Sequence, residues 1–183
     1  MVSGSKGLLP IHRAGVPLDG RLVHLRPASA SDQPVFAAIL RDPTVDPWWQ
    51  AADADAEARE LTAREDDVAV WAIEADGAVV GIVLGHEETE PRYRHGGIDI
   101  VLAASAQDRG LGSDAVRTVA RWLIEERGHH RVTIDPAASN ERAIRAYGRV
   151  GFRPVGIMRR YEGDLDGSWH DGLLMDLLAD ELT

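Results

Sequence analysis

The sequence predicts a mixed α/β fold built on one sheet. Two apolar runs, 67–76 and 78–88, are joined by Asp76-Gly77, which is a strong signal for a two-residue β-hairpin turn. Further along the chain, strand and helix patterns alternate before a second hairpin. Early antiparallel strands followed by a β-α-β-α-β-β series predict a mixed α/β sheet.

The N-terminal part begins with a leader at 1–18, rich in glycine, proline and serine, which we expect to lie outside the domain and to be irregular or disordered. Alternating apolar residues predict a first strand at 20–28. A helix is expected within 29–42, with Ser31 or Asp32 as its N-cap. Residues 19–183 are therefore expected to form a single domain.

The segment 42–50 contains two prolines and two tryptophans and is expected to be irregular. A short charged helix is predicted at 53–66. After the first hairpin, 89–95 reads as a loop. The second half then predicts a buried strand at 96–103, a helix at 110–128, a strand at 130–135, a helix at 139–151, and a hairpin of strands 152–162 and 168–179.

Composition narrows the classes of function. The chain has 183 residues and a formal net charge of −10, which disfavours nucleic acid and anionic membranes as partners and mildly favours a cationic substrate. There is no cysteine, so disulfide and thiolate chemistry are excluded. No apolar stretch is long enough to span a membrane, and the N-terminus lacks a signal-peptide core. A cytoplasmic protein is expected.

The seven histidines do not show the spacing of a metal site, so no metal is predicted. His129 and His130 precede a strand and are expected to be solvated. His170 lies in a predicted strand, within reach of a substrate site at that end of the sheet.

The stretch "QDRGLGSDAV" at 107–116 predicts an anion site, because a glycine loop between a strand and a helix exposes backbone N–H groups at the helix N-terminus. A nucleoside-triphosphate loop is excluded, since Gly112 is followed by Ser113 and Asp114 in place of lysine and a hydroxyl residue. The spacing of "GLGSDA" fits a dinucleotide fingerprint, with Asp135 as the ribose ligand. However, the residues after Gly112 are too few for a second mononucleotide-binding half. A turn that merely caps the helix is a further alternative.

A third candidate for the anion bound by this glycine loop is the pyrophosphate of coenzyme A. Gln107, Gly110 and Gly112 form Q-x-x-G-x-G, which resembles the central motif of the Gcn5-related N-acetyltransferase family. The following segment, "SNERAIRAYGRVGF", is similar to that family's next motif, in which Asn140 would lie near the pantetheine and Tyr147 would face the thioester sulfur. Asn140 and Tyr147 are seven residues apart, so both can project from one helix face.

This resemblance implies the family's fold, a mixed and mostly antiparallel sheet of about seven strands with a central parallel pair, flanked by about four helices. It makes 19–183 a single N-acetyltransferase domain that uses acetyl-CoA as co-substrate. The implied acetyl-CoA-binding residues are Ile100, Val101, Leu102, Gln107, Asp108, Arg109, Gly110, Leu111, Gly112, Ser113, Asn140, Ala143 and Tyr147. The strand edge at 100–102 would pair with the pantetheine, and Arg109 would add a positive charge near the phosphates.

Several short matches resemble the aminoglycoside 6′-N-acetyltransferases within that family: "GID" at 97–99, "DP" at 135–136, "SN" at 139–140, "RAI" at 142–144 and "WW" at 48–49. The resemblance implies that Asp99 and Asp135 contact a cationic acceptor and that Trp48 and Trp49 line its pocket. It makes Tyr147 the catalytic acid for the departing thiolate and Asp99 a candidate base.

Other interpretations stay open for these residues. Tyr147 could be a core ring, Asp135-Pro136 a strand-ending turn, and the tryptophans a plug at the core edge. The C-terminal half also resembles acetyltransferases of ribosomal proteins and small amines. The expected partner is therefore a small-molecule amine, with an aminoglycoside first and a protein N-terminus or small amine second. A non-catalytic CoA-binding module and a dinucleotide-dependent oxidoreductase are the alternatives of other classes, and the chain is expected to be a monomer or a homodimer.

Overall fold

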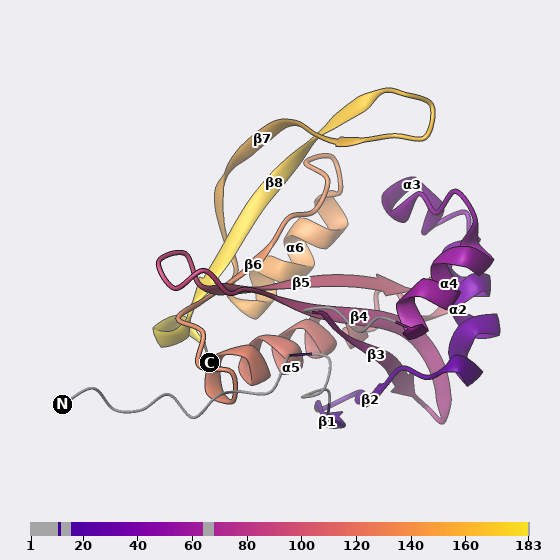
Figure 1. The fold of residues 1–183 in the computed structure, drawn as a ribbon, viewed down its shortest axis with the longest axis horizontal. Coiled ribbons are helices and arrows are strands. Elements are labelled where there is room, and N and C mark those ends of the chain that lie inside the picture. Colours follow the sequence, from indigo (N-terminus) through magenta and orange to yellow (C-terminus); the bar gives the residue numbers. More distant parts are fainter. Residues whose placement is uncertain (1–10, 12–15, 64–67, 183) are drawn as a thin grey trace.

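The structure is a computed structural model, and it describes residues 11, 16–63 and 68–182. One sheet of eight strands runs through this part of the chain in the order β1-β2-β3-β4-β5-β6-β8-β7 (Figure 1). The strands are β1 (Leu18–Asp19), β2 (His24–Pro27), β3 (Val68–Ala75), β4 (Ala78–Glu88), β5 (His95–Leu102), β6 (Arg131–Ile134), β7 (Arg153–Gly163) and β8 (Trp169–Leu178). All neighbours are antiparallel except the central pair β5 and β6.

Helices cover both faces of this sheet. They are α2 (Gln33–Leu40), α3 (Asp46–Trp49), α4 (Ala54–Ala63), α5 (Leu111–Glu125) and α6 (Glu141–Val150), with 3₁₀ turns at Ala30–Asp32, Ala104–Ala106 and Ala179–Glu181. Successive residues of a strand point to opposite faces, so one strand serves two cores. Trp71 and Val83 pack with the α5 side chains, whereas Ala72 and Ile82 pack with α2 and α4.

Two polar anchors fix α5 against the sheet. The buried carboxylate of Asp114 accepts hydrogen bonds from the backbone N–H groups of Leu22 (2.6 Å) and Val23 (3.2 Å). At the other end, Glu87 of β4 accepts from Arg127 (2.8 and 2.9 Å) and lies 2.7 Å from Nε2 of His129. The first contact fixes the start of α5, where the glycine loop lies, and the second fixes the segment after its end against β4.

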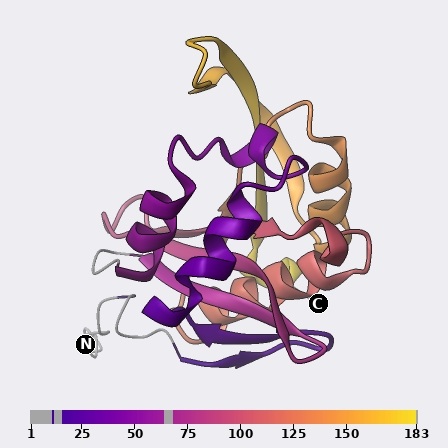
Figure 2. The same ribbon diagram turned by 90° about the vertical axis from the view of Figure 1, so that its right-hand side faces the viewer.

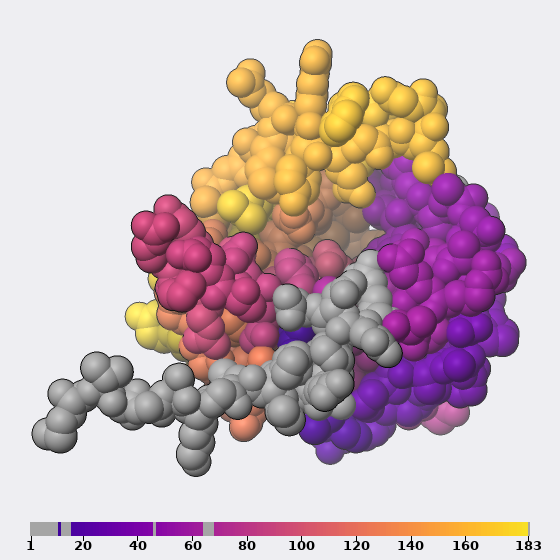
Figure 3. Space-filling model, in the orientation of Figure 1, coloured from indigo at the N-terminus to yellow at the C-terminus, as the bar shows by residue number. Residues whose placement is uncertain are grey.

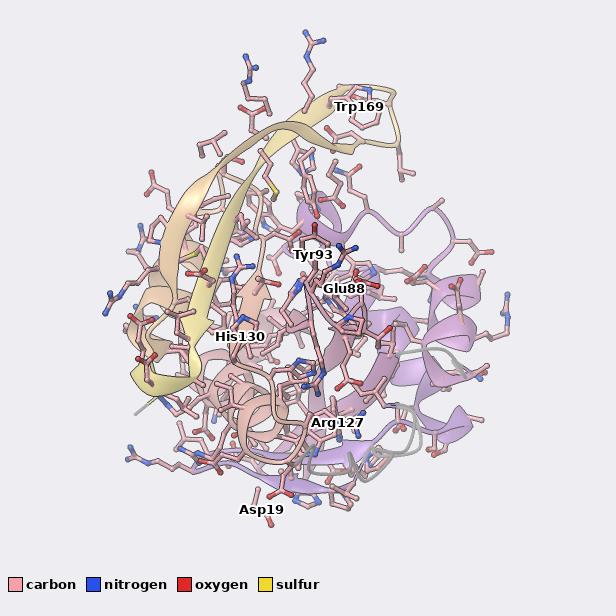
Figure 4. The ribbon with its side chains drawn as sticks, turned by 60° about the vertical axis from the view of Figure 1, so that its left-hand side comes forward. Asp19, Glu88, Tyr93, Arg127, His130 and Trp169 are labelled. Carbon is pink, nitrogen blue, oxygen red and sulfur yellow. The ribbon has the colours of Figure 1, made fainter. Side chains whose placement is uncertain are left out.

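The parallel pair is short, and this creates the central opening of the fold. β5 and β6 pair only through Gly96–Val132 and Gly97–Thr133, within the described residues. Beyond Gly97 the two strands part, so the rest of β5 has β4 on one side and no strand on the other. The hairpin of β7 and β8 rises above the sheet next to this opening (Figures 1 and 2). Figure 4 shows Trp169 at the outer end of that hairpin, at the opposite end of the molecule from Asp19.

The predicted α/β class, the Asp76-Gly77 turn and the central parallel pair are confirmed. Both turn residues have positive φ (52° and 78°), as a type I′ turn requires. The expected number of about seven strands is exceeded because the short β1 adds an eighth, and the expected four helices become five α-helices in the described residues.

Three expected boundaries differ. The first strand covers only His24–Pro27, since residues 20–23 form a loop held by Asp114. The segment 42–50 was expected to be irregular, which is wrong in part: Asp46–Trp49 form one helical turn, and proline is tolerated in the first turn of a helix. The helix predicted at 110–128 covers Leu111–Glu125. The predicted charged helix is described over Ala54–Ala63, and its predicted end lies outside the described residues.

Most of the predicted leader also lies outside the described residues, namely 1–10 and 12–15. Of the remainder, Ile11 is buried in the α5 core, and the carbonyl of Val16 accepts a 2.9 Å hydrogen bond from Nε1 of Trp71. Leu18 pairs with Leu25 in the sheet.

Candidate active site

A cleft of about 570 Å³ passes through the opening between β5 and β6. One wall is the open edge of β5, from Ile100 to Leu102, and another is the glycine loop with the start of α5. Gly110 is the N-cap of α5 and has a φ of +81°, a conformation that glycine adopts without strain. The cleft is lined by Thr44, Val45, Trp48, Trp49, Ile100, Val101, Leu102, Gln107, Asp108, Gly110, Gly112, Ser113, Asn140, Arg142, Ala143, Ala146, Tyr147 and Arg149.

The first-turn N–H groups of α5 have no partner within the helix, so they can bind an anion at the loop. Gly112 lies close to β5, because a Cβ added to it would be 3.0 Å from Cδ1 of Leu102. Gln107 fixes the loop from the other side, donating 3.0 Å to the carbonyl of Leu102. The donor set and its shape fit a pyrophosphate.

The positive charge of the cleft comes from helix α6. Arg142 and Arg149 line the cleft, and Arg142 also donates to the side-chain oxygen of Gln107. Arg109, expected to supply that charge, instead forms a 2.7 Å ion pair with Asp76 of the β3–β4 turn and is not among the lining residues. Leu111 also contributes no side chain, since it is buried in the core.

The two motif residues of α6 have distinct roles in the structure. Asn140 is the N-cap of the helix, and its Oδ1 accepts a 3.1 Å hydrogen bond from the N–H of Ala143. Tyr147 lies where the cleft meets a second cavity. Burial raises the pKa of its phenol well above the usual range, and the carboxylates of Asp99 and Asp135 raise it further. Tyr147 is therefore protonated throughout the neutral range.

The second cavity, of about 580 Å³, lies on the α2 and α4 side of the sheet. Asp99 lies within β5, two residues beyond its last pairing with β6, and Asp135 directly follows β6. Both face the cavity together with the two tryptophans of α3, and Tyr161 and Glu162 of β7 close its far wall. The space-filling view shows the surface hollowed beneath the β7–β8 hairpin, between the hairpin and the purple N-terminal segments (Figure 3).

Tyr161 and Asp135 are joined across this cavity. The phenol donates a 2.5 Å hydrogen bond to Oδ2 of Asp135, and this bond, with burial and the neighbouring carboxylates, raises the pKa of Tyr161 to about 12. Asp99 lies 3.8 Å from Nε2 of His86 on β4. Three carboxylates, two phenols and two indoles therefore surround the space next to the opening of the cleft.

The sequence interpretation missed several of these residues. Arg142 and Arg149 were not singled out, although their spacing from Tyr147 places them on the same helix. Tyr161 and Glu162 had no signal, because only the tertiary position of the hairpin brings them to the cavity. His170 does not line it: Nδ1 lies 2.9 Å from Asp164, and Nε2 lies 3.3 Å from Glu162.

The expectation that His129 is solvated is wrong, because its ring is buried against Glu87; His130 is exposed as expected. Within the described part of the chain, no group of three or more His, Asp or Glu is placed to bind a metal ion. In the same residues, no helix is long and apolar enough to cross a membrane.

Comparisons with known proteins give the same family. Residues 22–153 match the model of the acetyltransferase (GNAT) domain. The aminoglycoside N(6′)-acetyltransferase type 1 of Klebsiella pneumoniae is 38% identical over 78 residues, which cover 42% of this chain but only 38% of that protein. The kanamycin resistance protein of Rhizobium radiobacter is 38% identical over 78 residues, 42% of this chain and 70% of that protein.

Two solved structures cover nearly all of this chain. RimJ of Mycobacterium smegmatis in complex with CoA-disulfide is 26% identical with a TM-score of 0.78, over 91% of this chain and 88% of that one. The aminoglycoside acetyltransferase AAC(6′)-Ib in complex with coenzyme A is 25% identical with a TM-score of 0.71, over 87% and 96%. The fold, the glycine loop and the match of residues 22–153 to the domain model all indicate the same family. The chain belongs to the GNAT acetyltransferase family.

Proposed function

We propose that this protein is an N-acetyltransferase that moves the acetyl group of acetyl-CoA to a primary amine of a polycationic acceptor, with the 6′-amine of an aminoglycoside as the first choice. The observation that carries the proposal is the meeting of two cavities at Tyr147. One has the N–H groups and arginines that suit a pyrophosphate, and the other has the carboxylates that suit an amine. The expected location is the cytoplasm.

The proposed acetyl-CoA site uses the whole cleft. The first-turn N–H groups of α5 and the guanidinium groups of Arg142 and Arg149 would bind the pyrophosphate. The open edge of β5 at 100–102 would pair with the pantetheine, and one of its N–H groups would polarise the thioester carbonyl.

The proposed reaction is direct attack in a ternary complex. The ammonium group of the acceptor first loses a proton to Asp99, and the amine nitrogen then attacks the thioester carbonyl carbon. The tetrahedral intermediate collapses with loss of the thiolate, which takes a proton from Tyr147, and the nitrogen loses its second proton to restore the phenol. Because the chain has no cysteine, an acyl-cysteine intermediate is excluded.

The acceptor is proposed from charge and shape. Asp99, Asp135 and Glu162 put three carboxylates around one cavity. Trp48 and Trp49 supply aromatic faces that attract cations. A small molecule with several ammonium groups would pair with these carboxylates at once. The matches to an aminoglycoside acetyltransferase and a kanamycin resistance protein support this choice.

Release of free CoA thiol from acetyl-CoA tests the proposal, with kanamycin, spermidine, lysine and a set of peptides with free N-termini as acceptors. We expect turnover with kanamycin at saturation and weak turnover with the peptides. Turnover with peptides and none with kanamycin would overturn the aminoglycoside acceptor and leave an N-acetyltransferase. Tight acetyl-CoA binding without thiol release from any amine would leave a CoA-binding module.

A protein N-terminus is the second candidate acceptor. The observation that favours it is the resemblance of the C-terminal half of the sequence to acetyltransferases of ribosomal proteins and small amines. The peptide arm of the same assay decides between the two acceptors.

A further inference from the structure

The second cavity, where the acceptor is proposed to bind, is called the acceptor cavity from here on. A third cavity, of about 500 Å³, adjoins it along the sheet. The two cavities share Asp99, Asp135 and Tyr161. Its other polar residues are His86 of β4, His95 of β5, and Arg131 and Thr133 of β6. Asp99 can therefore be reached from two sides: from the acceptor, and from this side cavity.

His86 is held in the side cavity next to Asp99. In the β4–β5 ladder His86 pairs with Gly97, so Asp99 is its diagonal neighbour on the same face. The imidazole lies directly over Gly97, since a Cβ on that glycine would be only 2.2 to 2.9 Å from three ring atoms. This absence of a side chain lets the ring reach toward Asp99, with Nε2 at 3.8 Å from Oδ2. Both side chains are nearly half exposed, 44% for His86 and 45% for Asp99.

The proposed reaction needs a route for one proton. An ammonium acceptor and acetyl-CoA give an amide, a thiol and one proton per turnover. The thiol keeps the proton that passes through Tyr147, so the proton first taken by Asp99 must reach solvent before the next cycle. When a polycation covers Asp99 from the acceptor cavity, the side cavity is the remaining way out for this proton, and His86 lies on that side.

We propose that His86 is that neighbour. Asp99 receives the ammonium proton on its carboxylate. The proton then passes to Nε2 of His86, and the imidazole ring releases it from the side cavity to water. The 3.8 Å separation is bridged by a small side-chain rotation or by one water molecule. His86 thus acts on the reaction through Asp99, and this inference rests on the acetyl transfer proposed above.

The other charged or titratable groups that face this cavity are held by partners of their own. His95 Nδ1 lies 2.8 Å from the carbonyl of Tyr93, and Arg131 forms a 2.8 Å ion pair with Asp176. Asp135 accepts from Tyr161. His95 lines the same cavity, and its ring is held by a backbone carbonyl in place of a carboxylate, so it provides a matched control.

The test replaces His86 by glutamine, which keeps a polar side chain but cannot carry a proton in the neutral range. Thiol release is followed with saturating acetyl-CoA and kanamycin, or the most active amine of the panel, between about pH 6 and pH 9 at low buffer concentration. We expect kcat of His86→Gln to fall by about tenfold or more, with little change in either KM. Added imidazole should restore much of the rate, and His95→Gln should behave as wild type.

Rescue by imidazole separates a missing proton carrier from a structural defect, because a distorted site is not repaired by a free base. His86→Asn provides a second variant if glutamine prevents folding. A wild-type kcat in a folded variant across this pH range, or a loss that imidazole does not relieve, would overturn the relay while leaving acetyl transfer intact. A wild-type enzyme that acetylates no amine would overturn the proposed function and the relay together.

Discussion

Gln50 and Asp164 are hydrogen-bonded through their side chains across 114 residues of sequence. Gln50 follows α3, and Asp164 lies at the tip of the β7–β8 hairpin. The N–H of Leu165 returns a 3.0 Å hydrogen bond to Oε1 of Gln50. This pair of bonds joins the segment that carries Trp48 and Trp49 to the hairpin that carries Tyr161 and Glu162, so it closes a ring around the acceptor cavity.

Gln50→Ala should therefore loosen the acceptor cavity more than the acetyl-CoA cleft, which shares only Trp48 and Trp49 of this ring. Loss of a hydrogen-bonded link of this kind costs about 1 kcal/mol, so we expect the acceptor KM to rise by about fivefold. Steady-state kinetics with each substrate varied in turn measures the change in the acceptor KM and in the acetyl-CoA KM separately. Ser168→Ala is the control, since Ser168 bonds to Asp164 within the hairpin and does not cross the cavity. An equal rise in both KM values would show that the bonds between Gln50 and the hairpin do not act on the acceptor cavity in particular.

Tyr147→Phe should lower kcat by about 100-fold or more with a small change in the acetyl-CoA KM. Phenylalanine keeps the ring and removes only the proton donor. Because burial and the two carboxylates raise the pKa of Tyr147, the phenol stays protonated, and wild-type kcat should show no alkaline decline due to this residue below about pH 10. A wild-type kcat in the variant would show that Tyr147 contributes packing and is not the proton donor.

Gly112→Val should weaken acetyl-CoA binding by at least tenfold. The branched side chain would crowd Leu102 and stand over the N–H groups at the start of α5. Isothermal calorimetry measures the affinity, and circular dichroism checks the fold. Gly148→Val is the matched control, because an added Cβ at Gly148 of α6 meets nothing within 4 Å. Unchanged affinity in a folded Gly112→Val protein would exclude this loop as the phosphate site.

The parts that the sequence predicts best are those encoded locally. Asp76-Gly77 and the Gly110–Gly112 loop determine their own backbone conformation, and the period of 111–125 determines which face of α5 is buried. The partners of charged side chains are determined by the fold, so sequence proximity misleads there. Arg109 lies next to the glycines yet pairs with Asp76, whereas Arg142 reaches the loop from another helix.

The residues around the acceptor cavity are also brought together by the fold and not by local sequence. Asp99 and Asp135 could be proposed only because short motifs around them resemble those of the aminoglycoside 6′-N-acetyltransferases. Tyr161 reaches Asp135 only because β8, and not β7, pairs with β6, so that β7 is the edge strand and its hairpin extends beyond the sheet. No local pattern in the sequence encodes that strand order.

Glu87→Gln should destabilise the fold by about 3–5 kcal/mol, since it leaves the buried guanidinium of Arg127 without its counter-charge. Burial alone would raise the pKa of Glu87, but the hydrogen bonds from His129 and Arg127 outweigh it and lower that pKa to about 2. The contribution of the lowered pKa is complete above the ordinary value of 4.5 and is lost as pH falls toward about 2.

Chemical denaturation of both proteins from neutral pH down to about pH 3 measures this difference. The stability gap between wild type and Glu87→Gln should narrow as the pH falls below about 4.5. Glu141→Gln is the control, because its pair with Arg145 is exposed on α6 and should be worth about 0.5 kcal/mol or less. A gap that stays constant with pH would show that Glu87 acts by packing and not by charge.

Asp135→Asn should raise the KM of a polycationic acceptor by about tenfold and spare that of acetyl-CoA, because a charge-assisted bond to one ammonium group is lost. Asp99→Asn should raise the acceptor KM as well, and should also lower kcat, since it removes the proposed first proton acceptor.

Added salt should raise the wild-type acceptor KM, because it screens the attraction between the carboxylates and the acceptor, and it should affect the Asp135→Asn variant less. Asp166→Asn, at the exposed hairpin tip and outside both cavities, removes one negative charge from the chain without touching the site. If Asp166→Asn raised the acceptor KM as much as Asp135→Asn, the attraction would come from the net charge of −10 and not from the carboxylates of the cavity.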